Sequence, residues 1–319
     1  MKNLLDKKPF IIAEVGSNWK RSNILEENLA LARRHIYDAS LCGVNAVKFQ
    51  FFTHRELYGV DGPNDYNLPS NWLPILAHDC ARNNVEFMCS AFSEEGLKYV
   101  DSFVNIHKIA SSEALHLKLL EAAKKTGKPF LVSNSGLTDQ EYLQMNHYQP
   151  TAVLICSAKY PAKTEDYSLS FPIGGLSDHT LDETLALMAI GCNASIFEKH
   201  FDALSDFKGV KPSPDSSVSV GPQALERYCT LIRRAYYAFA NEVQSYDPLF
   251  KSRWQRRLKV TKPLKAGQDI LEYGINFGIY RSLNDDSRAA GPLELSQFQG
   301  KRVKREMKPQ DGLWFDDIE

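Results

Sequence analysis

The sequence predicts an α/β fold, a TIM (β/α)8 barrel followed by a small β-rich domain. Short apolar runs alternate with helical stretches through eight units over about 240 residues, the number and length typical of such a barrel. The residues after the first run, Glu-Val-Gly-Ser-Asn at 14–18, lack the glycine-rich turn that usually opens a doubly wound sheet. The barrel is therefore preferred to an open sheet. A change of composition near residue 246 predicts the second domain.

Each expected strand is a short run of apolar and β-branched residues, bounded by polar or turn-forming residues. The first begins at Phe10, and the second reads Ala-Val-Lys-Phe-Gln-Phe-Phe from Ala46. In chain order, the eight runs cover residues 10–15, 46–52, 85–92, 106–110, 130–132, 152–156, 173–177 and 195–201.

Helical spacing of apolar residues predicts the segments between these runs. The helix expected at 23–41 has one core stripe, formed by Leu25, Leu29, Ala32 and Ile36. Gly127 closes the helix at 115–126, and Thr138 with Glu141 three positions later forms a capping box that starts another. Further helices are expected at 72–84, 94–100, 182–191 and 222–241.

The composition shift divides the chain into domains. Residues 246–257 are polar and basic and are interrupted by Pro248, and the later short runs are broken by Pro263 and Gly267. We expect a barrel domain over 1–243, a linker over 244–257 and a small domain with little helix over 258–319. A domain of about sixty residues has a marginal core and often leans on a partner surface.

The overall composition excludes several classes of partner. The formal net charge of −1 gives no general attraction for nucleic acid or for an anionic membrane. The six cysteines show no CxxC pair or zinc-like spacing, which fits reduced thiols in a cytosol. The first eight residues lack an apolar signal core, and no later run approaches the length of a membrane span. We therefore expect a cytoplasmic protein with no nucleic-acid or membrane partner.

Two motifs each end an apolar run with a histidine near a carboxylate. They are GLSDHT, which contains His179, and IFEKHF, which contains His200, and a helical segment lies between them. Two parallel strands joined by such a helix would bring both imidazoles to one edge of the sheet. Two neighbouring imidazoles suit a divalent metal, with carboxylates nearby as further ligands. The metal could polarise a carbonyl oxygen as a Lewis acid.

Two lysines predict an anion site beside this pair. Lys48 and Lys108 stand in apolar strands, where an ammonium group is costly unless it meets an anion. Serines accompany them at the other strand ends, namely Ser90, Ser111, Ser133 and Ser177. Ammonium and hydroxyl groups together suit phosphate and carboxylate. Candidate acid/base or hydroxyl-binding carboxylates are Glu14, Glu113 and Asp215. An aldol-type condensation fits this set, and phosphoester hydrolysis stays open.

The ordered motifs IIAEVGSN, VKFQ, KIASSE, YP, GLSDHT and IFEKHF resemble those of the N-acetylneuraminate (sialic acid) synthase family. The closing segment resembles that family's C-terminal antifreeze-like (β-clip) domain. The resemblance implies a transferase that condenses phosphoenolpyruvate with an N-acylated hexosamine such as N-acetylmannosamine and releases phosphate. It also implies a domain-swapped homodimer, in which Arg281 from the neighbouring subunit lies over the N-acyl group of the sugar.

The resemblance also implies a role for each site residue. His179 and His200 would hold the metal, Mn²⁺ in the first place, with Mg²⁺ or Co²⁺ as alternatives. Phosphoenolpyruvate would be bound by Lys48, Ser90, Lys108, Ser111, Ser133 and Ser177. The sugar hydroxyls would be held by Glu14, Gln50, Tyr160 and Asp215. Glu113 would be the general acid/base near the attacking water, and Glu14, Lys108 and His200 would also act in catalysis.

The chain departs from the family pattern at a few positions. Trp19 follows Asn18 where the family usually has histidine, Ala158 stands where an asparagine usually helps to bind phosphoenolpyruvate, and the turn at 133–137 is one residue longer. These departures concern the acceptor sugar more than the reaction. Two alternatives remain open: a related phosphoenolpyruvate-dependent synthase of a 3-deoxy-2-keto sugar acid from another aldose, and a non-catalytic sugar-binding homologue.

Overall fold

The computed structural model of the protein describes residues 5, 8–62, 66–169, 173–240, 255–270, 276–281 and 289–319. The chain forms two compact units, Met1–Ala240 and Asn241–Glu319. The linker expected at 244–257 lies almost entirely outside the described residues. Each unit is considered by itself below.

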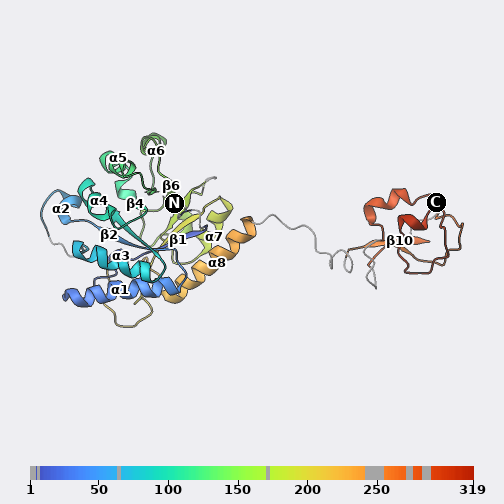
Figure 1. The fold of residues 1–319 in the computed structure, drawn as a ribbon, viewed down its shortest axis with the longest axis horizontal. Coiled ribbons are helices and arrows are strands. Elements are labelled where there is room, and N and C mark those ends of the chain that lie inside the picture. The colour runs from blue at the N-terminus through green and yellow to red at the C-terminus, as the bar shows by residue number, and fades with distance from the viewer. Residues whose placement is uncertain are drawn as a thin grey trace. The chain divides into compact units, whose positions relative to one another are not determined.

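The first unit is the predicted barrel. Its eight strands are all parallel to their neighbours and close in sequence order, from β1 round to β8 and back to β1 (Figure 1). The strands are β1 Phe10–Glu14, β2 Ala46–Phe51, β3 Glu86–Ala91, β4 His107–Ile109, β5 Phe130–Asn134, β6 Ala152–Cys156, β7 Gly175–Asp178 and β8 Ile196–His200. The prediction of a TIM-type barrel is therefore confirmed.

Helices surround these strands (Figure 1). They are α1 Leu25–Leu41, α2 His54–Tyr58, α3 Leu73–Arg82, α4 Glu94–Asp101, α5 Leu117–Lys125, α6 Asp139–Asn146, α7 Thr184–Gly191 and α8 Pro222–Ala240. The capping box predicted at Thr138 and Glu141 is present and starts α6. The short helix α2 was not predicted. It is held by a second capping box, between Thr53 and Glu56.

The expectation of eight complete strand–helix units is wrong at one connection. Between β6 and β7, the described residues contain only a 3-10 turn at Thr164–Asp166. This connection instead packs against the end of β7 through Tyr167. The Tyr167 hydroxyl donates to the carbonyl of Ser177 at 3.1 Å and accepts from the amide of His179 at 2.8 Å. These bonds hold it beside the predicted metal residue.

Alternation along the strands divides the core into two parts. Ile11 and Ala13 face outward, where they join the large core between strands and helices, whereas Ile12 faces the barrel interior. The interior floor is apolar and is formed by Leu5, Phe10, Ile12, Ala46, Met88, Ile106, Leu131, Leu154 and Ile196. Burying each large apolar side chain contributes about 1.5–3 kcal/mol. Inward-facing residues two positions later, such as Glu14, therefore lie above this floor, at the carboxyl ends of the strands.

The core stripe predicted for α1 is only partly correct. Ala32 and Ile36 are fully buried, and Leu29 packs against the core. Leu25 is 57% exposed. It is the first residue of the helix, so it lies before the part of α1 that packs on the barrel.

The second unit is small and has no α-helix among its described residues. Strand β9 (Arg257–Val260) pairs antiparallel with β10 (Phe277–Tyr280), and two 3-10 turns follow at Pro292–Gln297 and Phe315–Asp317. The unit has its own apolar core, with Leu258, Val260, Leu264, Ile270, Phe277, Phe298, Val303, Met307 and Leu313 buried. These observations agree with a compact domain of little helix, and its likeness to an antifreeze-like domain stays a prediction.

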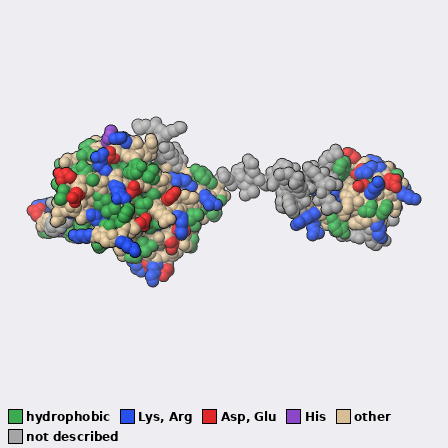
Figure 2. Space-filling model, turned by 90° about the horizontal axis from the view of Figure 1, so that it is seen from below, with side chains coloured by type: hydrophobic (Ala, Val, Ile, Leu, Met, Phe, Trp, Pro, Cys, Tyr) green, Lys and Arg blue, Asp and Glu red, His purple; other side chains and the backbone are tan. Residues whose placement is uncertain are grey.

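One face of the barrel unit carries charges of both signs. Figure 2 shows Lys and Arg side chains interspersed with Asp and Glu side chains on one face of the barrel unit. Within the described part of the chain, no helix combines the length and the apolar character that crossing a membrane requires.

Candidate active site

Buried polar side chains converge on a small cavity of about 50 Å³ at the carboxyl ends of the barrel strands. Eleven of the residues predicted for the site line it. They are Glu14, Lys48, Gln50, Ser90, Lys108, Ser111, Ser133, Tyr160, Ser177, His179 and His200. Ala110, Cys156 and Glu198 complete the lining. The structure thus brings together most of the residues that the sequence singled out.

The strand register explains this convergence. Glu14 is in register with Lys48 on one side and with His200 on the other, so three inward-facing groups lie side by side. Further round the barrel, Ser90 pairs with Lys108, and Ser177 pairs with Glu198. In a parallel barrel such neighbours point into one mouth, where active sites of this fold lie.

The two lysines are neutralised by two buried carboxylates. Lys48 Nζ lies 2.5 Å from Glu14 Oε2 and 3.6 Å from Glu198 Oε2. Lys108 Nζ lies 3.3 Å from Glu198 Oε1, which also accepts a hydrogen bond of 2.9 Å from Ser177 Oγ. Each charged group is 3% exposed or less, so the network is shielded from water. Each lysine of the predicted pair therefore has a carboxylate beside its ammonium group.

The shifts of pKa reflect burial and this pairing. Burial alone would lower the pKa of Lys48, but Glu14 and Glu198 raise it to about 12. Burial lowers the pKa of Lys108, and Glu198 offsets only part of that effect. Burial alone would raise the pKa of Glu198, but Lys108 and Lys48 hold it far below its ordinary range. Burial raises the pKa of Glu14, partly against Lys48. The two carboxyls therefore differ in how readily they take a proton.

Four buried atoms of the mouth have no hydrogen-bond partner among the described residues: Glu14 Oε2, Glu198 Oε2, Ser133 Oγ and His200 Nδ1. The two carboxylate oxygens form ion pairs with Lys48, whereas Ser133 Oγ and His200 Nδ1 do not. The nearest carboxylate oxygen to His200 Nδ1, Asp215 Oδ1, is 3.9 Å away. A buried polar atom without a partner is costly, so such atoms mark places where a ligand or a water would be bound.

The two predicted metal residues are neighbours. The ring centroids of His179 and His200 lie 5.2 Å apart. His179 Nδ1 donates to the carbonyl of Ser157 at 2.6 Å, which leaves its Nε2 with a lone pair. Burial and the nearby His200 lower the pKa of His179 to about 4, and burial also lowers the pKa of His200. Both rings are thus neutral at pH 7, the form that binds a metal.

The residues present fit a divalent ion only if substrate or water supplies further ligands. Among the residues that the structure describes, no group of three or more His, Cys, Asp and Glu side chains is arranged to hold a metal. Two histidine nitrogens nevertheless fit a metal site. His200 Nδ1 has no hydrogen-bond partner among the described residues, and the bond from His179 Nδ1 to the Ser157 carbonyl orients that ring. Such a site leaves coordination positions open, as catalytic metals require.

Asp215 reaches the mouth from the segment between β8 and α8. Its Oδ2 accepts from the amide and from the hydroxyl of Ser17, both at 2.6 Å. Gly16 makes this approach possible, since it has a φ of +54° and a Cβ there would overlap with Asp215 Oδ2. One carboxylate oxygen is therefore occupied, and the predicted contact with a sugar hydroxyl could only be made by Oδ1.

Two other predicted site residues do not line the cavity. Glu113 lies in the 3-10 turn after β4, with its side chain 19% exposed and 3.5 Å from His116 Nδ1. Arg281 is an exposed residue that directly follows β10 in the second unit. Their expected roles stay predictions.

Glu198 is the carboxylate of IFEKHF, which was considered from the sequence only as a further ligand of the metal and not as a partner of the lysines. Its alternation with His200 in IFEKHF was the available signal, because residues two apart on a strand share a face. Cys156 was assigned only to the scattered thiols. Its Sγ lies 3.8 Å from His179 Nε2. Nothing in the sequence around it indicated this contact.

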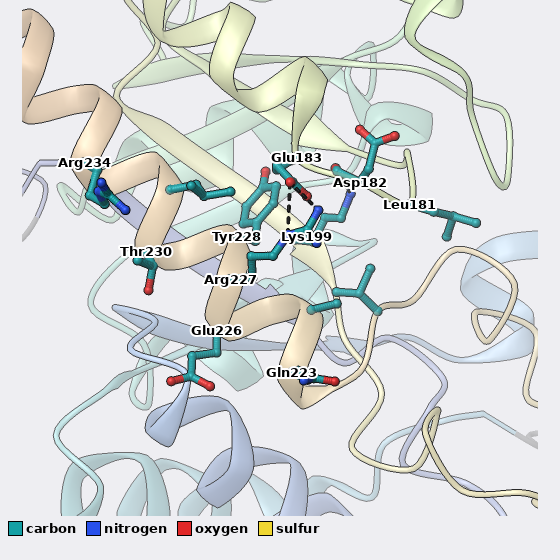
Figure 3. Close-up of a pocket in the computed structure, with 13 residues that line it drawn as sticks. Leu181, Asp182, Glu183, Lys199, Gln223, Glu226, Arg227, Tyr228, Thr230 and Arg234 are labelled. Atoms are coloured by element: carbon teal, nitrogen blue, oxygen red, sulfur yellow. Dashed lines mark hydrogen bonds and ion pairs between the residues drawn. The ribbon is translucent and has the colours of Figure 1, made fainter.

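A larger cavity of about 720 Å³ lies outside the barrel wall, along α8 and the segment 181–183 (Figure 3). Of its charged groups, Arg227 is already paired with Glu183, and Lys199 is paired with Asp178. It contains neither the histidines nor the lysine–serine set. The smaller cavity at the barrel mouth is therefore the candidate active site.

Comparison with known proteins identifies the family of this chain. The model of the NeuB family matches residues 35–244. The chain is 26% identical to pseudaminic acid synthase of Helicobacter pylori, over 98% of each chain. It is also 26% identical to N,N'-diacetyllegionaminic acid synthase of Legionella pneumophila, over 97% of this chain and 94% of the relative.

A solved structure is similar as well. The N-acetylneuraminic acid (sialic acid) synthetase from Leptospira borgpetersenii, in complex with citrate, superposes with a TM-score of 0.65 at 25% identity. The match covers 76% of this chain and 88% of that structure.

Proposed function

Because this chain belongs to the NeuB family, we propose that it is a nonulosonic acid synthase that condenses phosphoenolpyruvate with an N-acylated hexosamine and releases phosphate. The observation that carries the proposal is the buried pair Lys48 and Lys108 at the barrel mouth, beside His179 and His200. A cradle for a small multiply charged anion next to a site for a carbonyl oxygen is what this condensation needs.

Phosphoenolpyruvate would bind to the two lysines and to the serines around them. Lys48 already donates to Ser90 Oγ at 3.1 Å, and Ser133 Oγ has no hydrogen-bond partner in the described structure. When the anion enters, its phosphate and carboxylate would take over part of the pairing that Glu198 now provides. Burial makes these interactions stronger than they would be in water.

We assign a divalent ion, Mn²⁺ first, to His179 and His200. When bound, the ion would hold and polarise the sugar aldehyde as a Lewis acid. The chain itself keeps the two imidazoles ready to bind the ion. Burial keeps both rings neutral, and the Ser157 carbonyl orients the ring of His179. Gln50, Tyr160 and Asp215 would orient the sugar hydroxyls around the aldehyde.

The bond changes balance as follows. C3 of phosphoenolpyruvate forms a bond with the aldehyde carbon, and the aldehyde oxygen takes a proton to become a hydroxyl. Water then adds to C2, and the phosphate leaves with cleavage of its bond to C2. Glu14 is the first candidate for the proton transfers, since it lines the cavity and burial raises its pKa. Glu113 would first have to turn away from His116.

Two classes of acceptor are compatible with this reaction. N-acetylmannosamine would give a sialic acid, whereas the name of the Legionella relative implies an acceptor with two acetylamino groups. Arg281, from the neighbouring subunit of a proposed domain-swapped dimer, would contact the acyl group in either case.

A panel of N-acylated hexosamines tests the proposal. Phosphate release from phosphoenolpyruvate should depend on one member of the panel, and the product mass should equal acceptor plus phosphoenolpyruvate plus water minus phosphoric acid. If neither mono- nor di-acylated sugars support release, the synthase function is wrong for this chain.

A further inference from the structure

The outward-facing residues beside the two histidines form a buried ion pair. In β7 and β8 the alternate residues Ser177, Glu198 and His200 face the mouth, whereas Asp178 and Lys199 face the helices. Asp178 is 0% exposed and Lys199 is 1% exposed, and they are in register across the two strands. Asp178 Oδ2 lies 3.1 Å from Lys199 Nζ.

A buried ion pair seldom adds net stability over apolar residues of similar size. The outer wall of a barrel is ordinarily apolar, so this pair calls for an explanation beyond packing. Its position is informative, because Asp178 directly precedes His179 and Lys199 directly precedes His200.

The contacts of the Lys199 ammonium go to the turn that carries His179. Nζ donates to the carbonyls of Thr180 and Asp182, the latter at 3.2 Å. Asp178 Oδ1 accepts from the amide of Thr180 at 2.9 Å and from its hydroxyl at 2.7 Å. Together the pair therefore bonds the backbone of residues 180 and 182, on the C-terminal side of His179.

The backbone of His179 itself is held by the Tyr167 hydroxyl, which accepts from its amide, and by the Ala162 amide, which donates to its carbonyl at 2.9 Å. The residues after His179 have less support from outside. The 720 Å³ cavity borders Leu181, Asp182 and Glu183 and reaches Lys199, so open space lies along this part of the wall (Figure 3). Tyr228 supplies an aromatic face 5.2 Å from Lys199 Nζ, and the Arg227–Glu183 ion pair lies beside it. With this little packing, the turn depends on hydrogen bonds.

We infer that Lys199 is a positioning residue, which fixes the turn 178–182 so that the His179 ring stays beside the His200 ring. It acts through backbone carbonyls and does not contact the substrate or the metal. The inference deepens the proposed function and rests on its assignment of a metal to the two histidines.

The test compares Lys199→Met with the unmodified full-length protein in two measurements. Hydrogen exchange of the metal-free protein, followed by mass spectrometry, should show faster exchange in a peptide covering 178–184. Titration with Mn²⁺ alone, followed by electron paramagnetic resonance, should show a dissociation constant raised about 10–100-fold, as for other outer-shell partners of metal ligands.

Two further variants make the result interpretable. Arg234→Met removes an exposed arginine of α8 that lines the same cavity but lies outside the 178–184 segment, so both measurements should match the unmodified protein. Lys199→Met leaves Asp178 unpaired and could prevent folding. The double variant Asp178→Asn with Lys199→Met removes both charges but still withdraws the donor from the Thr180 and Asp182 carbonyls, and should show the same two changes.

The outcomes separate the inference from the proposed function. Unchanged exchange at 178–184, or faster exchange with unchanged Mn²⁺ affinity, would overturn the positioning role. If the unmodified protein itself binds no divalent ion, the metal assignment fails instead, and the exchange measurement alone decides whether Lys199 holds the turn.

Discussion

Glu198 shows how much of the site depends on one side chain whose pairing with the two lysines was not predicted from the sequence. Its carboxylate lies within 3.3 Å of Lys108, within 3.6 Å of Lys48 and within 2.9 Å of the Ser177 hydroxyl. A sequence reveals a lysine in an apolar strand but not the group that neutralises it. Glu198 lies in β8 and meets Lys48 of β2 and Lys108 of β4 only because the strands close into a barrel.

Glu198→Gln should therefore destabilise the protein by about 3–5 kcal/mol, because it removes one partner of a buried ion pair. Urea denaturation measures this loss. Glu121→Gln is the matched control, since it breaks the exposed Glu121–Lys125 pair and should leave the free energy of unfolding unchanged.

The same variant also tests the anion cradle. It keeps both lysines and loses a negative charge beside them, so phosphoenolpyruvate should bind at least as tightly as before, as measured by calorimetry. Weaker binding to correctly folded Glu198→Gln would mean that Glu198 is not displaced by the anion.

A buried histidine away from the mouth predicts a pH effect on stability. Burial lowers the pKa of His107 below its ordinary value of 6.5, although Asp101 at 2.9 Å partly offsets the shift. Below pH 6.5 the unfolded chain then binds more protons than the folded one at this site, so stability is full above pH 6.5 and falls as the pH decreases.

His107→Gln should flatten this dependence, because glutamine can still donate to Asp101 but does not titrate. Free energies of unfolding at pH 7.5 and at pH 5.5 measure the effect. An equal fall in both proteins would assign the acid sensitivity to other groups.

At the scale of elements, the loop after β8 can pack against the loop after β1 only because residue 16 is a glycine. A Cβ at residue 16 would overlap with Asp215 Oδ2, and the φ of +54° adds backbone strain. Gly16→Ala should cost about 1–3 kcal/mol and raise the KM of the acceptor, because the Asp215 carboxylate would be displaced.

Gly59→Ala is the control for Gly16→Ala. Gly59 also has a positive φ, +74°, but a Cβ there would meet nothing within 4 Å, so only the conformational strain is added. Stability should fall slightly while the KM of the acceptor stays constant. An equal rise of KM in both variants would show that the Asp215 contact has no part in acceptor binding.

The elements themselves were largely predictable, because each strand of the barrel is an apolar run bounded by polar residues. Because the strands were predictable, their carboxyl ends were too, and so was the convergence of Lys48, Lys108, His179 and His200. The connection after β6 was not predictable, since its structure depends on Tyr167 bonding to the end of β7. The prediction that Leu25 is buried was wrong for a similar reason, because helical spacing does not show which turn of a helix packs on the barrel.

At the scale of the molecule, the barrel unit holds the cavity and the second unit holds Arg281. The proposed dimer predicts that Arg281→Ala raises the KM of the acceptor roughly tenfold or more and leaves the KM of phosphoenolpyruvate unchanged, through loss of a charged hydrogen bond.

Arg302→Ala is the control. Arg302 is an exposed arginine of the same unit and pairs with Asp269, so its loss should change neither KM. Equal losses for both substrates in Arg281→Ala would mark that arginine as structural.

The choice between condensation and simple hydrolysis of phosphoenolpyruvate is the central question about the whole protein. The direct measurement is the rate of phosphate release from phosphoenolpyruvate in three mixtures: with acceptor and Mn²⁺, without acceptor, and with acceptor after chelation. The proposed synthase predicts release in the first mixture alone, and recovery of the third when Mn²⁺ is restored. Phosphate release at the same rate without acceptor would contradict the synthase and identify the protein as a phosphoester hydrolase.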